Sequence, residues 1–229
     1  MLNSKTRYLS KKWLDHALGL TAFPMPAVAY LGLFKSDPGE EGFLTSEVSG
    51  GSYARKNLTT AMGEATLSTS IATNSAAITF ATPTADWGLI THAGIMDALT
   101  GGNMLYSGSL NAIFFVTNAS IAPYFQIGSI SVAELTVSDN NGKTRYLSKK
   151  LIDHTLGKAS YTMPSTYIGL FSADPGQDGA LTDEVAGASY VRKALTASMA
   201  DTSLANGLSS NETVVEFPLP SESWGTLTH

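Results

Sequence analysis

Lys5-Thr-Arg-Tyr-Leu-Ser-Lys-Lys-Trp-Leu-Asp-His-Ala-Leu-Gly19 occurs twice in this chain. It returns as residues 143–157, where 12 of the 15 positions are identical. Later motifs return in the same order: Tyr30-Leu-Gly-Leu-Phe34 matches residues 167–171, and Trp87-Gly88 matches residues 224–225. A period of about 137 residues is too long for a solenoid unit and has the size of a domain. The sequence therefore predicts two tandem copies of one domain.

The join between the copies is placed at residues 138–142, whose Ser, Asp, Asn and Gly are typical of a linker. We expect a complete repeat, copy one, at residues 1–138 and a second repeat, copy two, at residues 139–229. Copy two has no counterpart of residues 93–135, so it is C-terminally truncated. Missing strands would expose unpaired sheet edges. We therefore expect either that the chain continues past His229 or that a neighbouring chain supplies these strands.

One short helix and many short strands are predicted in each copy. Apolar side chains in residues 8–18 recur at helical spacing, which indicates an amphipathic helix covering a face of a sheet. Ser10 is the expected N-cap, and Gly19 is the expected left-handed C-terminal residue. The best hairpin turn is Gly101-Gly102. The predicted strands of copy one are residues 28–34, 52–60, 76–81, 89–97, 104–110, 112–117 and 127–137.

These elements define a mainly β fold class. Short strands with frequent turn signals favour tandem β-sandwich domains or small barrels, each with one short N-terminal α-helix.

Composition excludes several classes of function. Charged residues make up 14% of the 229 residues, against about 25% in typical proteins, and the net charge is −5. Lys and Arg form no basic stripe, so nucleic acid is not an expected partner. The absence of cysteine excludes disulfides and Cys-ligated zinc. The N-terminus lacks the apolar core of a signal peptide, and no apolar run reaches the ~20 residues of a membrane span. We expect no membrane contact and synthesis in a cytoplasm.

The duplicated Asp-His pairs, Asp15-His16 and Asp153-His154, are the most obvious acid/base candidates. Neighbouring residues on a helix point in different directions, so their spacing alone does not make a dyad. We expect both pairs to cap or pack at the end of a helix. His92 and His229 each follow Thr without a second ligand at metal spacing, and we expect them in the core or at an interface. Trp87 is expected to fill the core.

A calcium site is a second candidate. The loop Asp37-Pro-Gly-Glu-Glu-Gly42, together with Glu47, could gather oxygen ligands, but it lacks the alternating acidic positions of an EF-hand loop. We expect a structured surface loop in which Glu47 pairs with Arg55, as Glu184 pairs with Arg192 in copy two. No Gly-rich phosphate loop and no nucleophile elbow occurs. The sequence therefore predicts no catalytic, cofactor-binding or metal site, and no enzyme.

Taken together, the motifs resemble a family of tailed-bacteriophage virion proteins of the tail fibre or minor tail type. The runs that carry this resemblance are Leu14-Asp-His-Ala-Leu-Gly19, Tyr30-Leu-Gly-Leu-Phe-Lys-Ser-Asp-Pro-Gly39, Glu47-Val-Ser-Gly-Gly-Ser-Tyr-Ala-Arg55, residues 74–80 and residues 87–103. The resemblance implies a non-enzymatic virion component that makes repeated protein–protein contacts in the tail fibre, the neck or the capsid surface. It implies tail, neck or major capsid proteins as partners, homo-oligomers, and assembly in the host bacterial cytoplasm.

Two more specific functions compete with this one. The first is a capsid decoration or cement protein. The second is a host-glycan-binding module of a receptor-binding fibre, in which exposed Trp13, Tyr53 and Tyr190 would stack on sugars; Leu151 replaces Trp13 in copy two, which argues against it. A depolymerase would need two placed carboxylates, and the sequence offers no convincing pair.

Overall fold

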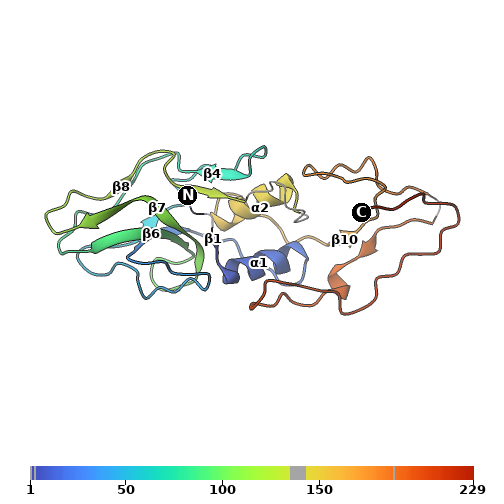
Figure 1. Ribbon diagram of the computed structural model, residues 1–229, viewed down its shortest axis with the longest axis horizontal. Helices are drawn as coiled ribbons and strands as arrows, with labels where there is room; N and C mark the ends of the chain where they lie inside the picture. Colours follow the sequence, from blue (N-terminus) through green and yellow to red (C-terminus); the bar gives the residue numbers. More distant parts are fainter. Residues whose placement is uncertain (1, 3, 135–142, 188) are drawn as a thin grey trace. The chain divides into compact units, whose positions relative to one another are not determined.

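A computed structural model describes residues 2, 4–134, 143–187 and 189–229 (Figure 1). The described residues are mainly β, with several sheets and two α-helices, one of them near the N-terminus, as the sequence predicts. The predicted boundary after residue 138 lies outside the described residues. None of the helices in the described part is long and apolar enough to cross a membrane.

The chain forms two compact units, and their composition does not follow the order of the two copies. Unit 1 combines the strands of copy one with most of the helix of copy two. Unit 2 combines the part of copy two that follows its helix with most of the helix of copy one. Unit 1 consists of Met1–Ser10, Pro24–Leu135 and Leu147–Tyr161, and unit 2 of Lys11–Phe23, Thr136–Tyr146 and Thr162–His229.

Unit 1 is built on an antiparallel five-stranded sheet in the order β1-β7-β6-β2-β3. Two small strand pairs accompany it, β4 with β9 and β5 with β8, both antiparallel. The strands are β1 (Ser4–Lys5), β2 (Tyr30–Phe34), β3 (Lys56–Asn57), β4 (Ile71–Thr73), β5 (Ile78–Thr79), β6 (Gly88–Met96), β7 (Met104–Val116), β8 (Tyr124–Phe125) and β9 (Ser131–Ala133).

The hairpin of β6 and β7 forms the centre of this sheet, the two green strands in Figure 1. Its turn contains Gly101 at φ +60° and Gly102 at φ +72°, which confirms the predicted turn because glycine adopts positive φ without steric cost. Asp97 closes the turn by accepting a hydrogen bond from the Asn103 N–H at 2.7 Å. The strand β7 is continuous where two strands, 104–110 and 112–117, were predicted.

Three predicted strands are much shorter than expected. Residues 76–81 form only β5. Only β3 forms within residues 52–60, because Ser52 adopts φ +68°, outside the range of a strand. Only β9 forms in the described part of residues 127–137, because Gly128 adopts φ +78° in a turn. The sequence pattern showed where these strands lie but not how long they are.

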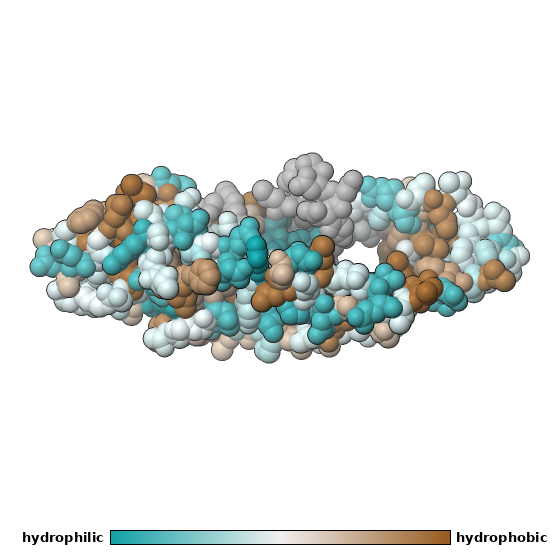
Figure 2. Space-filling view, turned by 60° about the horizontal axis from the view of Figure 1, so that its bottom comes forward, coloured by the Kyte–Doolittle hydropathy of each residue, from teal (hydrophilic) through white to brown (hydrophobic). Residues whose placement is uncertain are grey.

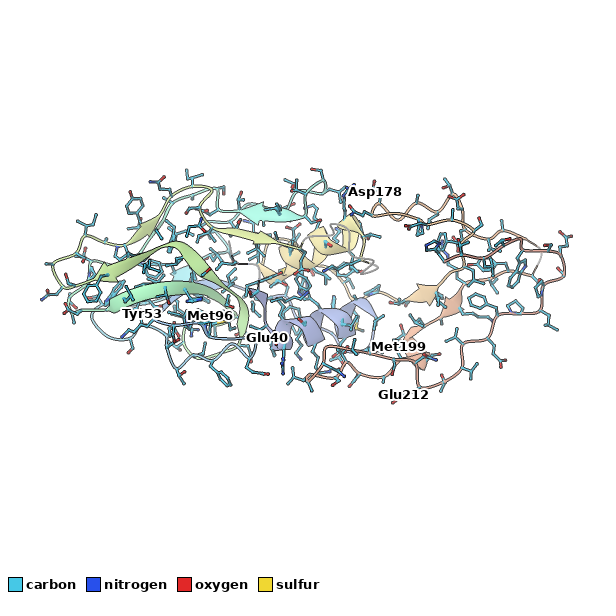
Figure 3. All side chains as sticks on the ribbon, in the orientation of Figure 1. Glu40, Tyr53, Met96, Asp178, Met199 and Glu212 are labelled. Atoms are coloured by element: carbon cyan, nitrogen blue, oxygen red, sulfur yellow. The ribbon has the colours of Figure 1, made fainter. Side chains whose placement is uncertain are left out.

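An aromatic cluster fills unit 1. The Tyr53 ring stacks on Phe80 at 6.0 Å and meets the edge of Trp87 at 5.4 Å between ring centroids. Trp87 is fully buried, as predicted, and its indole N–H donates to the Gly51 carbonyl at 2.9 Å. Gly32 lies beside Tyr53 and Met96, both labelled in Figure 3, and a side chain at Gly32 would overlap the Met96 methyl group. A larger residue there would have to displace the end of the Met96 side chain.

Unit 2 repeats parts of this design with less regular structure. Its strands β10 (Tyr167–Ile168) and β11 (Lys193–Ala194) pair antiparallel, and the 3₁₀ helix η1 (Thr196–Ser198) follows. Tyr190 stacks on Phe217 at 6.1 Å and meets the edge of Trp224 at 5.6 Å, the arrangement found in unit 1. The duplicated sequence thus rebuilds the aromatic cluster.

Candidate functional site: a reciprocal helix-docking site

The two helices, α1 (Arg7–Ala17) and α2 (Arg145–Thr155), are the duplicated stretch that opened the sequence. The helix α1 begins earlier than predicted, and its N-cap is Thr6 instead of Ser10. The Thr6 hydroxyl accepts a hydrogen bond from the Leu9 N–H at 3.3 Å and donates to the Met104 carbonyl at 2.7 Å. Ser10 donates its N–H to the Thr6 carbonyl, so it lies inside the first turn. The contact with β7 decides which hydroxyl caps the helix.

Both helices end in a glycine-capped Schellman motif. Gly19 adopts φ +75°, its N–H donates to the His16 carbonyl at 3.2 Å, and the Leu20 N–H donates to the Asp15 carbonyl at 2.8 Å. Gly157 makes the same ending in α2, with φ +68°. The predicted C-terminal glycine is therefore confirmed.

In unit 1 the Asp of the Asp-His pair binds the loop between β3 and β4 of the other copy. Asp153 of α2 is 1% exposed, and its Oδ1 accepts a hydrogen bond from the backbone N–H of Ala65, in copy one, at 2.7 Å. Its Oδ2 forms an ion pair with Lys149 Nζ at 2.5 Å, and the same Nζ lies 3.1 Å from Glu64 Oε2. The buried carboxylate therefore has both of its oxygens bound.

Unit 2 contains the reciprocal bond. Asp15 of α1 is 2% exposed, and its Oδ1 accepts a hydrogen bond from the backbone N–H of Thr202, in copy two, at 2.8 Å. Its Oδ2 pairs with Lys11 Nζ at 2.7 Å. Burial alone would raise the pKa of Asp15, but the hydrogen bonds from Lys11 and Thr202 outweigh it, so the pKa is lowered.

A threonine in each copy binds the C-terminal end of the other copy's helix. In unit 1 the Thr59 hydroxyl donates to the Leu156 carbonyl at 2.8 Å and accepts from the Ala29 N–H. In unit 2 the Thr196 hydroxyl donates to the Leu18 carbonyl at 2.8 Å. These bonds satisfy carbonyls that have no partner within their own helix.

The two histidines fix the chain that leaves each helix. His154 Nδ1 accepts a hydrogen bond from the Tyr161 N–H at 2.9 Å, and His16 Nδ1 accepts from the Phe23 N–H at 3.0 Å. An imidazole nitrogen that accepts an amide proton is itself unprotonated. Each Asp and its neighbouring His thus bind different backbone amides, which confirms the prediction that both pairs pack at a helix end.

A comparison with known families identifies the repeat. The model of a family described as "Podophage GP4 fiber I protein gp80" matches residues 4–133 and again residues 142–229. The chain belongs to this phage fibre family. Each match takes in one of the two helices, so the helix is part of the gp80 repeat itself. A search of curated proteins found no significant match.

The loop considered as a calcium candidate, in the first gp80 repeat, uses its carboxylates elsewhere. Asp37 Oδ1 accepts a hydrogen bond within its own turn, and Arg7 pairs with Glu40 at 3.0 Å and with Glu41 at 2.8 Å. Glu47 faces a different partner, Arg55. Among the residues that the structure describes, no group of three His, Cys, Asp or Glu side chains could hold a metal ion. The loop is organised by arginine pairing.

The Glu47–Arg55 pair is the buried ionic contact that the sequence predicts. Arg55 binds both carboxylate oxygens of Glu47, at 2.6 and 2.7 Å, and its Nη1 donates to the carbonyls of Ala98 and Gly101. This one guanidinium therefore ties Glu47 to the β6–β7 turn. The Tyr53 hydroxyl also donates to Glu47, at 3.1 Å.

In the second gp80 repeat the same pair is more open. Arg192 binds Glu184, as predicted, but its side chain is 46% exposed, whereas that of Arg55 is 3% exposed. Arg192 is the main cause that lowers the pKa of Glu184. The chemistry is duplicated while the burial differs.

The remaining sequence candidates are not assembled into a site. Trp13 is buried, and the hydroxyls of Tyr53 and Tyr190 are bonded to Glu47 and Glu184, so the expectation of exposed sugar-stacking aromatics is wrong for Trp13.

Neither His92 nor His229 lies in the core. His92 is half-buried and His229 exposed, and the ring Nδ1 of each bonds the hydroxyl of the preceding Thr. A place in an interface remains a prediction for both. The docking role of Ala65 and Thr202 had no signal in the sequence, because it uses their backbone N–H.

Proposed function

We propose that this fibre-family chain is a non-enzymatic structural component of the virion that works through repeated protein–protein contacts. The observation that carries the proposal is the use of the duplicated Asp-His pairs, the most obvious acid/base candidates, as structural anchors between the copies. Other virion proteins are the proposed partners, with assembly in the host bacterial cytoplasm.

The outer end of the β6–β7 hairpin supplies a contact surface. Leu89 and Phe115 face each other in register, and Leu89, Ile113 and Phe115 are 43%, 61% and 65% exposed. Figure 2 shows brown, apolar side chains gathered at the end of unit 1 where this hairpin lies. An exposed apolar patch favours a protein–protein contact. We infer that a virion partner covers it.

A pair of substitutions tests this surface. Replacing Ile113 and Phe115 by Ser should lower incorporation of the chain into particles, with little effect on folding, because both side chains are exposed. Ile121→Ser is the matched control, since Ile121 is 81% exposed and lies outside the hairpin. Equal incorporation of the wild type, the double variant and the Ile121→Ser control would exclude the hairpin as the contact surface.

Immunogold electron microscopy of the source particle tests the place of the chain. Label on the tail or neck would support a fibre or collar component and would make a glycan array the next measurement for host binding. Label spread over the head would instead support a capsid decoration protein. Intact particles without label would contradict the virion assignment.

A further inference from the structure

The contacts that each helix makes with the other copy are reciprocal. The carboxylate of Asp153, in copy two, binds the Ala65 N–H of copy one, and the carboxylate of Asp15, in copy one, binds the Thr202 N–H of copy two. The hydrogen bonds from Thr59 to Leu156 and from Thr196 to Leu18 also join one copy to the other in both directions. In an isologous dimer, each subunit uses the same two surface residues, so that a contact made in one direction is repeated in the other. The two copies meet this condition. Here both partners belong to one chain.

The polar contacts of the docking site do not distinguish one helix from the other, whereas the buried Trp13 of α1 corresponds to the smaller buried Leu151 of α2. Both helices present the same Lys, Asp, His and Gly at the same spacing, in a stretch with 12 of 15 positions identical. The other copy offers a backbone N–H, from Ala65 or Thr202, and a threonine hydroxyl, from Thr59 or Thr196. A backbone N–H is the same group whichever side chain accompanies it. The polar recognition is therefore common to both copies.

We propose that each docking site also accepts the corresponding helix of another chain of this protein. The partner is a second copy of this chain, and chains join by exchanging helices. The inference goes beyond the proposed function, because it concerns how chains join and holds wherever in the particle the chain lies.

The connection after the helix favours exchange over self-docking. Unit 2 ends its first segment at Phe23 and unit 1 resumes at Pro24, so the chain crosses between units at this point. Pro24 and Pro26 fix φ in this connection and disfavour helical turns in the residues before them. Such a segment favours an extended path, and exchange of an identical element through such a hinge is a low-cost route to dimers.

Concentration decides which copy supplies the helix. Tandem copies on one chain see each other at an effective concentration on the order of millimolar, as for other short linkers. A dilute chain therefore closes on itself. Crowded chains, as in a growing fibre, compete with that closure and link to one another.

The natural ion pair between Lys149 and Glu64 allows a direct test with the full wild-type chain. Its atoms lie 3.1 Å apart, within reach of a zero-length carbodiimide that joins an amine to a carboxylate. Light and heavy-nitrogen chains would be mixed one to one, unfolded, refolded together at rising protein concentration, cross-linked and digested. Mass spectrometry then separates mixed cross-links, which form only between chains, from unmixed ones. Random pairing of chains makes half of the between-chain cross-links mixed.

An internal control comes from Lys5 and Glu134, which lie 3.3 Å apart within copy one. Helix exchange between chains should produce mixed Lys149–Glu64 cross-links, about a quarter of the total near millimolar protein and at most about half at higher concentration, while Lys5–Glu134 cross-links stay unmixed. The proposal would be overturned if neither cross-link contained both isotope labels, or if both cross-links did. It would also be overturned if no Lys149–Glu64 cross-link formed.

Discussion

The carboxylate of Asp153 lies 2.7 Å from the backbone N–H of Ala65, although 88 positions separate the two residues in the chain. A buried carboxylate that accepts a backbone N–H makes a charge-assisted bond, which is stronger than a neutral one. This bond places the helix of copy two in the same compact unit as the strands of copy one.

Asp153→Ala should destabilise the chain by about 1–3 kcal/mol, because it leaves the buried Ala65 N–H without its acceptor. Chemical denaturation of the full chain measures the loss. The control is Asp178→Ala: Asp178, labelled in Figure 3, pairs with Arg145 but is 77% exposed, so its loss should stay within about 0.5 kcal/mol. Equal losses for the two variants would show that the Asp153 bond adds nothing.

Arg55→Ala and Arg192→Ala should differ, although they remove the same pair from the two copies. Arg55 is buried, and its removal leaves Glu47 as an uncompensated charge, at a cost of about 3–5 kcal/mol. Arg192 is half-exposed, and water replaces it at a cost of about 1 kcal/mol or less. Thermal and urea unfolding of both variants provides the comparison. A larger loss from Arg192→Ala would contradict the difference in burial.

Gly157→Ala should cost more than Gly176→Ala. Both glycines adopt nearly the same φ, +68° and +67°, so both variants suffer the left-handed strain of about 1–2 kcal/mol. A Cβ at Gly157 would also lie 2.8 Å from the Pro26 carbonyl, whereas a Cβ at Gly176 would meet nothing within 4 Å. The extra loss, about 1 kcal/mol or more, reports the helix–strand contact in unit 1. Equal unfolding midpoints would argue that α2 does not pack against Pro26.

Acid should weaken the chain partly through Asp15. The folded pKa of this carboxyl is lowered, so its stabilising effect is present above the unfolded value of about 3.9 and is lost as pH falls through the folded pKa. Unfolding free energy measured from neutral pH down to about pH 2 should therefore fall less steeply below pH 4 in Asp15→Asn than in the wild type. Parallel curves would assign the acid sensitivity to other carboxyls.

Local chemistry made much of the fold predictable. The Gly101-Gly102 turn and the glycine end of α1 follow from positive φ, and the Glu47–Arg55 pair follows from opposite charges in a repeated motif. The N-cap was missed because Thr6 and Ser10 both carry hydroxyls. Only the Met104 carbonyl, distant in sequence, decides between them.

The exchange of helices could not be predicted from the sequence, because duplication makes the two alternatives identical in pattern. Asp15 and Asp153 stand in the same pattern of polar and apolar residues, so no residue type says whether each binds its own copy or the other one. The amide donors, Ala65 and Thr202, differ in side chain and act through the backbone. Only the three-dimensional arrangement distinguishes the two pairings.

The presence of α2 within unit 1 also sets an order of events during synthesis. A ribosome releases copy one first, but the Ala65 N–H and the Thr59 hydroxyl gain their partners only when residues 153–156 have emerged. The first repeat to be translated therefore completes its fold only after part of the second repeat has been made. Translation keeps it unfinished, and open to a helix from a neighbouring nascent chain, for that interval.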